Sequence, residues 1–226
     1  MSSAETDTEA AAPSDERREA LLAGLTEALG DAVAAHHLDA GRDLVVRVDT
    51  AAWQEAARAA RDRLGFAYFS FLSAIDWLPS PYGRGMDSEV DNELSGAVPK
   101  DPGEMALGVT GGSSRFQVLA RLHSLRRGVG LTLKADVPEE TMAVDSWSGL
   151  YAGANWHERE CWEMFGITFV GHPGLRHLYL PGDFEGHPLR KDFPLLARHV
   201  KPWPGIVDVE AMPGVADEGE AEGGDQ

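Results

Sequence analysis

Hydrophobic side chains recur with helical spacing in two segments of the first third of the chain. The leucines of residues 16–29 fall on one side of a helix, which predicts an amphipathic helix there. Ser14 precedes this helix as the expected N-cap, and Gly30 follows it as the expected stop. A second helix is predicted to begin at Thr50 and to end at Gly65.

Four other segments show the apolar runs or the apolar–polar alternation that is typical of strands. They are residues 43–48, 66–75, 115–125 and 129–135, and a turn at 126–128 joins the last two as a hairpin. Three strands follow the second helix with no helix between them. This order predicts an α+β fold, in which helices pack on a mixed, largely antiparallel sheet, rather than repeated βαβ units.

A third helix is predicted in a segment of different character that starts at Ser146. Residues 156–165 (WHERECWEMF) follow Asn155, which is the expected N-cap, and Glu158 three residues later completes a capping-box pattern. Gly166 is expected to end the helix with a Schellman-type stop.

Both sides of this third helix carry a tryptophan and a carboxylate. One side presents Glu158, Cys161, Trp162 and Phe165, and the other presents Trp156, Glu160, Glu163 and Met164. A helix that rests on a single core shows a cleaner division of polar and apolar residues. The pattern therefore favours contacts on both sides, one with the helix's own domain and one with another surface. Burial of the helix on all sides is the alternative.

Residues 166–207 combine six prolines with many large apolar side chains. Such a segment cannot form a helix or a central strand, and its apolar area would be costly to leave in water. We therefore predict an extended, proline-rich C-terminal arm that lies on its own domain or on a partner with an acidic or polar groove. The expected interface residues are Phe184, His187, Leu189, Arg190, Lys191, Phe193 and Leu195, with Arg190 and Lys191 paired to acidic groups of the partner.

Charge divides the chain into folded and unfolded parts. The 226 residues carry a formal net charge of −17, and residues 1–20, 76–114 and 208–226 contribute −4, −5 and −7 of it. These acidic segments contain few aromatic residues, as disordered segments and loops do. The predicted order is a disordered acidic N-terminus (1–14), an α+β domain (15–165) with a flexible acidic insertion (79–114), a partner-binding arm (166–207) and a disordered acidic tail (208–226).

The composition also excludes several functions. An acidic chain is unsuited to sequence-independent nucleic-acid binding and to direct docking on an anionic membrane. With one cysteine it can build neither a disulfide framework nor a thiolate-only zinc or iron–sulfur site. There is no phosphate-binding glycine loop, transmembrane run or signal-peptide pattern, so we expect no cofactor on this chain and a cytoplasmic protein.

One local pattern keeps an enzymatic alternative open. His157 and Cys161 lie four residues apart with Glu158 between them, which imitates the zinc-binding helix of metalloproteases. A third ligand is not apparent in any motif. The alternative hypothesis is a stand-alone metal-dependent hydrolase that uses His157 and Cys161.

The spacing of residues between Ala154 and Leu195 resembles one family in detail. The signature residues are Glu158, Arg159, Glu160, Glu163, Met164, Phe165, His172, Arg176 and Leu178, and the segment 185–195 (EGHPLRKDFPL) continues the match. These residues resemble the 30 kDa subunit (the C subunit) of respiratory complex I, NADH:quinone oxidoreductase. The resemblance is strong over 145–207 and loose over 18–135. Residues 201–205 (KPWPG) resemble members from high-GC Gram-positive bacteria.

This resemblance implies a non-catalytic subunit of the peripheral arm of a proton-translocating enzyme. In such a complex, electrons pass from NADH through FMN and iron–sulfur centres to quinone, and none of these cofactors is held by this subunit. The implied partners are the 49 kDa-type subunit (the D-type subunit) and neighbouring peripheral-arm subunits. The implied location is the cytoplasmic side of the cell membrane, with membrane contact only through the complex. An equivalent subunit of a related membrane-bound hydrogenase or ferredoxin-driven complex is an alternative.

Overall fold

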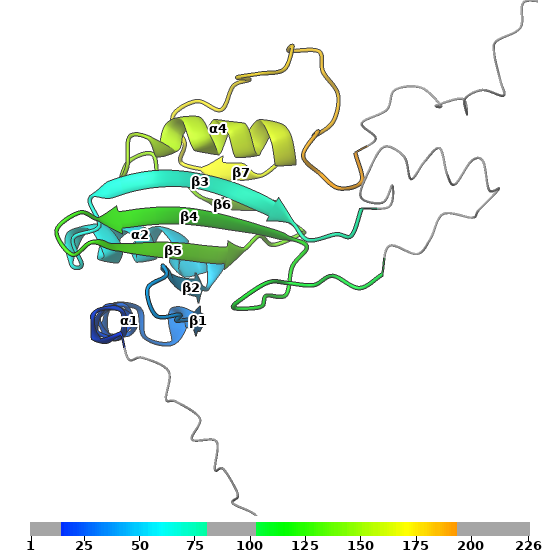
Figure 1. Cartoon of the computed structure of the whole chain (residues 1–226). Helices are drawn as coiled ribbons and strands as arrows, with labels where there is room; N and C mark the ends of the chain where they lie inside the picture. The colour runs from blue at the N-terminus through cyan, green and yellow to red at the C-terminus, as the bar shows by residue number, and fades with distance from the viewer. Residues whose placement is uncertain (1–14, 81–102, 194–226) are drawn as a thin grey trace, which may run out of the picture. The chain divides into compact units, whose positions relative to one another are not determined.

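A computed structural model describes residues 15–80 and 103–193, and its centre is a five-stranded sheet (Figure 1). The strands are β1 (Val33–His37), β2 (Leu44–Val48), β3 (Tyr68–Asp76), β4 (Phe116–Ser124) and β5 (Val129–Asp136), in the spatial order β1-β2-β5-β4-β3. Within this five-stranded sheet only β2 and β5 pair in parallel, and the other neighbours are antiparallel. The predicted mixed, largely antiparallel α+β fold is confirmed.

The described part of the chain contains three α-helices, each near its predicted position. They are α1 (Glu16–Leu29), α2 (Trp53–Asp62) and α4 (Ala154–Phe165), with short 3-10 turns η1 (Gly30–Ala32) and η2 (Thr50–Ala52). The N-cap of α1 is Asp15 rather than the predicted Ser14, because the Asp15 carboxylate accepts the backbone N–H of Arg18. The second helix is shorter than predicted, since its first turn is η2 and α2 ends at Asp62.

One hydrophobic core joins the sheet to α1 and α2 and also includes buried residues of α4. Alternate residues of β2, β3, β4 and β5 point into it, as the period of two requires. The small residues Ala56, Ala57 and Ala60 of α2 are fully buried, together with Trp53 at the start of that helix. Trp147 stacks on Trp53 with ring centroids 4.2 Å apart, so it ties the segment before α4 to the same core.

Two features place α4 against the sheet. α4 runs along β3, the strand at one edge of the sheet, where His157 Nδ1 lies 3.1 Å from the carbonyl oxygen of Leu72 (Figure 1). A helix in this position keeps the edge strand from pairing with another chain. The short parallel pair of β6 (Ala143–Asp145) and β7 (Thr168–Val170) flanks α4 in sequence on both sides.

The predicted arm begins with residues that belong to the domain. Ile167 and Phe169 are buried in the core, and β7 is a strand where the sequence showed no regular period. β7 was missed because a three-residue strand is too short to show a strand period. The described part of the arm therefore runs from Gly171 to Phe193, and residues 194–207 lie outside the described residues.

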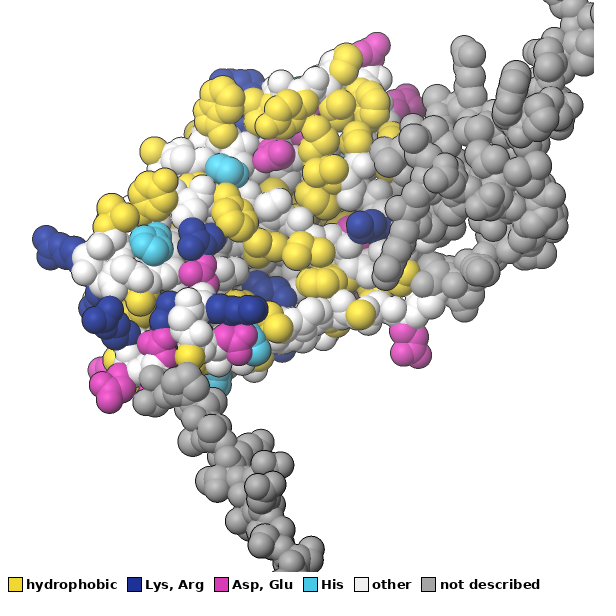
Figure 2. Space-filling model, viewed as in Figure 1, with side chains coloured by type: hydrophobic (Ala, Val, Ile, Leu, Met, Phe, Trp, Pro, Cys, Tyr) yellow, Lys and Arg dark blue, Asp and Glu magenta, His cyan; other side chains and the backbone are white. Residues whose placement is uncertain are grey.

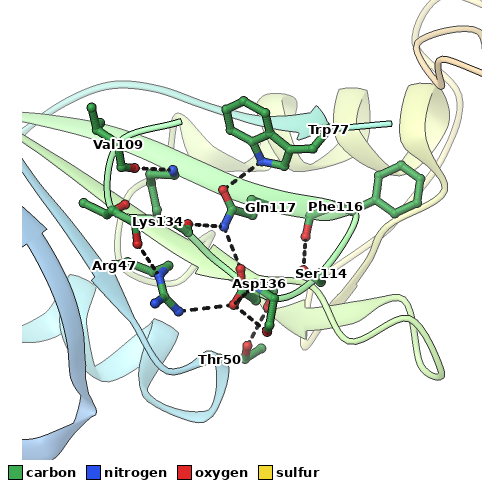
Figure 3. Close-up of polar contacts among 12 residues, drawn as sticks. Arg47, Thr50, Trp77, Val109, Ser114, Phe116, Gln117, Lys134 and Asp136 are labelled. Carbon is green, nitrogen blue, oxygen red and sulfur yellow. Dashed lines mark hydrogen bonds and ion pairs between the residues drawn. The ribbon is translucent and has the colours of Figure 1, made fainter. Parts of the chain in front are cut away.

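Three consecutive carbonyl groups of the segment before β4 each accept a hydrogen bond from a side chain of the sheet. The pairs are Lys134 Nζ with Val109 O (3.0 Å), Arg47 Nε with Thr110 O (2.9 Å) and Gln117 Nε2 with Gly111 O (2.9 Å). Figure 3 shows the first of these pairs and the donors Arg47 and Gln117. We call residues 108–112 the clasped loop. Residues 79–114 were predicted to be a flexible insertion, so these contacts differ from that expectation, and residues 81–102 lie outside the described residues.

The donors of the clasped loop are themselves tied together. Gln117 accepts a hydrogen bond from Trp77 Nε1 (2.8 Å) and donates to Asp136 Oδ1 (2.6 Å) (Figure 3). The Lys134 ammonium lies over the Trp77 ring, 5.4 Å from its centroid. Burial lowers the pKa of Lys134, the charge of Arg47 lowers it further, and Asp136 acts against both. The loop could not be recognised from sequence, because its acceptors are backbone carbonyls and its donors come from three separate strands.

Candidate partner interface

The helix α4 begins without the predicted capping box. It starts at Ala154, and its N-cap Gly153 has no side chain that could bond the helix. Asn155 lies inside the helix, where its carbonyl oxygen accepts a hydrogen bond from His172 Nε2 at 3.1 Å. The predicted C-terminal stop is confirmed, since Gly166 adopts a left-handed conformation (φ 75°) and its N–H donates to Trp162 O at 3.0 Å.

Glu158 is buried, and it accepts hydrogen bonds from the segment before α4 rather than from the N-terminus of the helix. Its carboxylate accepts hydrogen bonds from the Ser146 hydroxyl and the Trp147 N–H, both at 2.5 Å. Burial raises the pKa of Glu158 to about 7, and these two hydrogen bonds act against the rise. The capping-box prediction was wrong because Glu158 faces the core side of α4, where a competing pair of donors is available.

The buried carboxylate of Glu163 accepts hydrogen bonds from several backbone N–H groups of the arm. The N–H groups of Leu178 (2.7 Å), Tyr179 (3.1 Å) and Leu180 (2.6 Å) donate to it, and His177 Nδ1 lies 3.2 Å away. Burial acts to raise the pKa of Glu163, but these hydrogen bonds outweigh it and leave the pKa below its ordinary value. The ionised carboxylate thus supplies acceptors that a strandless, proline-rich segment cannot find in itself.

Arg159 supplies hydrogen-bond donors to carbonyl groups of the arm. Its guanidinium donates to Arg176 O (3.0 Å) and to His177 O (3.1 Å). The same group lies over the exposed Trp156 ring, 5.6 Å from its centroid. Two signature residues of α4 therefore bind the same stretch of the arm, Arg159 through the carbonyl groups of that stretch and Glu163 through its N–H groups.

The arm also satisfies the last carbonyl groups of α4, which have no partner within the helix. The pairs are His187 Nδ1 with Glu163 O (2.8 Å), the Leu189 N–H with Met164 O (3.1 Å) and Arg190 Nε with Phe165 O (2.7 Å). A side chain at Gly166 would collide with two of these groups, since its Cβ would lie 2.4 Å from Arg190 Nη2 and 2.5 Å from His187 Nε2. Glycine is therefore required here for both space and conformation.

A charged cluster fastens the end of the described arm to the sheet. Asp76 is fully buried and pairs with Arg115 at 2.7 Å, while its second contact is the N–H of Lys191 at 2.8 Å. Arg115 also pairs with Asp192 at 2.8 Å. Burial acts to raise the pKa of Asp76, but Arg115 and the backbone N–H groups hold the pKa below its ordinary value. The arm thus carries an anchor near each end of its described part.

The predicted interface residues divide into two groups in this arrangement. Leu189 is 49% exposed and Phe184 37% exposed, whereas His187 and Arg190 make the bonds to α4 described above. Phe193 is half-buried and its ring lies 5.9 Å from that of Phe184. The backbone of Lys191 bonds Asp76, while its side chain lies at the surface. Leu195 lies outside the described residues, and contact with a partner stays a prediction for the whole set.

Two aromatic residues outside that set are the most exposed on this side of the domain. Trp156 is 66% exposed and Tyr179 is 62% exposed. Figure 2 shows hydrophobic side chains gathered over the part of the molecule where α4 and the arm lie in Figure 1. The two-sided pattern of α4 had indicated one contact outside its own domain without saying which side makes it, and nothing in the sequence distinguished Tyr179 from the other apolar residues of the arm.

Each of the two residues of the hydrolase hypothesis has other surroundings in the structure than a metal site. His157 bonds a carbonyl of β3 and contacts the Phe69 ring with centroids 5.4 Å apart. Cys161 is buried in the core, and burial raises the pKa of its thiol, as do the charges of Glu160 and Glu158. The described residues contain no group of three or more potential metal ligands. This arrangement gives the hydrolase hypothesis no support.

Comparison with known proteins identifies the family. The profile of the family described as respiratory-chain NADH dehydrogenase, 30 Kd subunit, matches residues 46–199. The C subunit of NADH-quinone oxidoreductase from Stenotrophomonas maltophilia is 31% identical over 177 residues, which covers 68% of this chain and 69% of that protein. The chain therefore belongs to the family of the 30 kDa subunit of respiratory-chain NADH dehydrogenase.

Two further similarities extend this result. The C/D subunit of NADH-quinone oxidoreductase from Cronobacter sakazakii is 38% identical over 131 residues, and the match covers 56% of this chain but only 19% of that longer protein. A chain in the structure of the membrane-bound sulfane sulfur reductase, an archaeal respiratory membrane complex, matches 80% of this chain and 88% of its own length. Its TM-score of 0.54 at 19% identity shows a shared fold.

Proposed function

We propose that this chain is a non-catalytic subunit of the peripheral arm of a proton-translocating NADH:quinone oxidoreductase. Its role is to scaffold the quinone module, while FMN, iron–sulfur clusters, NADH and quinone are held by other subunits. The observation that carries the proposal is the division of the arm into polar contacts with α4 and exposed Tyr179, Phe184 and Leu189. An arm that is fixed to its own domain and still exposes large apolar side chains is suited to binding a partner.

The proposed partner is a subunit of the D type, with neighbouring peripheral-arm subunits beside it. Support comes from the relative named for both C and D, in which the matched region occupies 19% of a longer protein. We further propose a position on the cytoplasmic side of the cell membrane, reached through the complex. No helix in the described ranges is long and apolar enough to cross a membrane. An origin in a high-GC Gram-positive bacterium is proposed from residues 201–205 alone, which lie outside the described residues.

Affinity purification from native membranes tests the proposal. A tagged chain is expected to bring down a D-type subunit and a complex that oxidises NADH with quinone as acceptor. Recovery of the tagged chain alone, or with soluble proteins only, would contradict the proposal. The same preparation addresses the second candidate, an equivalent subunit of a related membrane-bound complex, which is favoured only by the fold shared with the archaeal sulfane sulfur reductase. That candidate predicts a membrane complex without NADH oxidation.

A further inference from the structure

A stripe of side chains runs along α4 from the exposed Trp156 to Met164, which packs partly against the core. Trp156, Glu160 and Met164 follow one another at intervals of four residues, so their side chains are neighbours along the helix. Trp156 is 66% exposed, and Glu160 and Met164 are half-buried. Across the two described ranges, the Glu160 carboxylate has neither a hydrogen-bond partner nor an ion-pair partner. The other two carboxylates of the helix, Glu158 and Glu163, are fully engaged.

The groups beside this stripe cannot neutralise Glu160. Arg159 donates to carbonyl groups of the arm and lies over Trp156. His157 turns to the Leu72 carbonyl of β3. In the arm, the Tyr179 N–H donates to Glu163, and the Tyr179 ring is exposed. The result is one carboxylate between Trp156 and Met164 along the helix. We call these three residues, together with Tyr179 and Leu189 of the arm, whose N–H groups bond Glu163 and Met164, the α4 surface.

We propose that the α4 surface docks a partner polypeptide that places a lysine or arginine side chain against Glu160 within an otherwise apolar contact. A half-buried carboxylate that is covered by a partner loses its water, and the complex is stable only when a cation replaces that water. Trp156 favours the same partner, because its exposed ring offers an apolar surface on which the aliphatic part of a lysine or arginine side chain can pack. Exposed tryptophan and tyrosine are also the residue types that most often dominate binding energy in interfaces.

The occupant is a basic face of the D-type subunit, so this inference rests on the proposed function and adds the chemistry of the contact. The α4 surface is continuous with the arm, which bonds the last turn of α4 through the Leu189 N–H. A second copy of this chain is disfavoured, because the net charge of −17 opposes self-association and a symmetric contact at α4 would oppose two Glu160 carboxylates. An anionic membrane surface is disfavoured by the same carboxylate.

Charge reversal in the whole complex tests the contact. Tagged D-type subunit is purified from cells that carry the full chain with Glu160→Lys, Glu160→Gln or Trp156→Ala. Glu27 is an exposed glutamate of α1 without a described partner, and Glu27→Lys is the matched control. Glu160→Lys is expected to reduce the recovered chain on the order of tenfold or more, Glu160→Gln less, and Glu27→Lys not at all. Circular dichroism of each purified chain establishes that the fold is kept.

A photo-cross-linking residue at position 160 identifies the molecule that contacts this position in the complex. A cross-linked peptide of the D-type subunit that contains lysine or arginine supports the inference. Normal recovery of both Glu160→Lys and Trp156→Ala overturns it, as does a cross-link to a second copy of this chain or to lipid. These outcomes leave the proposed function standing as long as the wild-type chain is recovered with the D-type subunit. Failure of the wild-type chain to be recovered overturns the proposed function itself.

Discussion

The Glu163 carboxylate accepts the backbone N–H of Leu180 at 2.6 Å, across 17 residues of chain. The same carboxylate bonds the two preceding N–H groups, so a single side chain of α4 substitutes for the strand that the proline-rich arm cannot form. This relationship explains how an irregular segment acquires one conformation before it meets a partner. An arm that is ordered in advance loses less conformational entropy on binding.

Removal of the Glu163 charge is expected to release the arm. Glu163→Gln keeps the volume but offers one acceptor to several N–H groups, and each buried donor left unpaired costs about 1–3 kcal/mol. Amide hydrogen exchange should accelerate at Leu178, Tyr179 and Leu180 and stay unchanged in β4 and β5. Glu27→Gln is the control. Unchanged protection of the three amides in Glu163→Gln would show that other contacts hold the arm.

The same interaction is expected to weaken in acid. The pKa of Glu163 is lower in the folded protein than its ordinary value of 4.5, so its stabilisation is complete above about pH 4.5. It is lost as the pH falls through the folded-state pKa. Protection of the three arm amides should therefore decline in acid more steeply in the wild type than in Glu163→Gln. Equal pH dependence of the two proteins would contradict the prediction.

Ionisation of Glu158 is expected to destabilise the folded protein, in contrast to ionisation of Glu163. Its pKa is about 7 in the folded protein and ordinarily 4.5, so between these values the folded protein keeps a proton that the unfolded chain releases. The free energy of unfolding therefore falls as pH rises through this window. Glu158→Gln cannot ionise, and its stability should vary less between pH 5 and 8 in urea unfolding. A difference between wild type and variant that is independent of pH would contradict this assignment.

The conformation of the clasped loop is expected to require a residue without a side chain at position 112. A Cβ there would lie 2.1 Å from Gln117 Nε2, which already bonds the carbonyl of Gly111. Gly112→Ala should displace the loop and cost about 1–3 kcal/mol of stability. Hydrogen exchange of residues 103–112 measures the displacement. Gly149→Ala is the control, because no atom lies within 4 Å of its Cβ position, and equal effects of the two variants would refute the steric argument.

Truncation of Phe193 is expected to weaken assembly without unfolding the domain. Phe193 packs on Phe184 and against Gly186 within the arm, and it is not a member of the hydrophobic core. Burial of such a ring at an interface contributes about 2 kcal/mol. Phe193→Ala should reduce recovery with the D-type subunit while circular dichroism of the isolated chain is kept. Loss of the fold, or normal assembly, would show that Phe193 serves its own domain only.

Sequence alone predicted α1, α2, α4, the strands β2 to β5 and the family, whereas the short strands β1, β6 and β7 were not predicted. The leucine spacing of α1, the alternation of β4 and β5 and the left-handed glycine after α4 are local signals, because each depends on residues within one element. The signature from Glu158 to Leu178 is also local in spacing. It indicated which residues matter, although it carried no information about what each one contacts.

Only the tertiary structure decided the roles of those residues. Glu158 looked like a helix cap, and Glu163 was known only as a signature residue on the other side of the helix. Their partners, the Trp147 N–H and the N–H groups of residues 178–180, are backbone groups, which every residue except proline carries and which leave no mark in a sequence pattern. The clasped loop escaped prediction for the same reason. A carboxylate's function here depends on which backbone donors the fold brings within about 3 Å of it, and that is a property of distance in space.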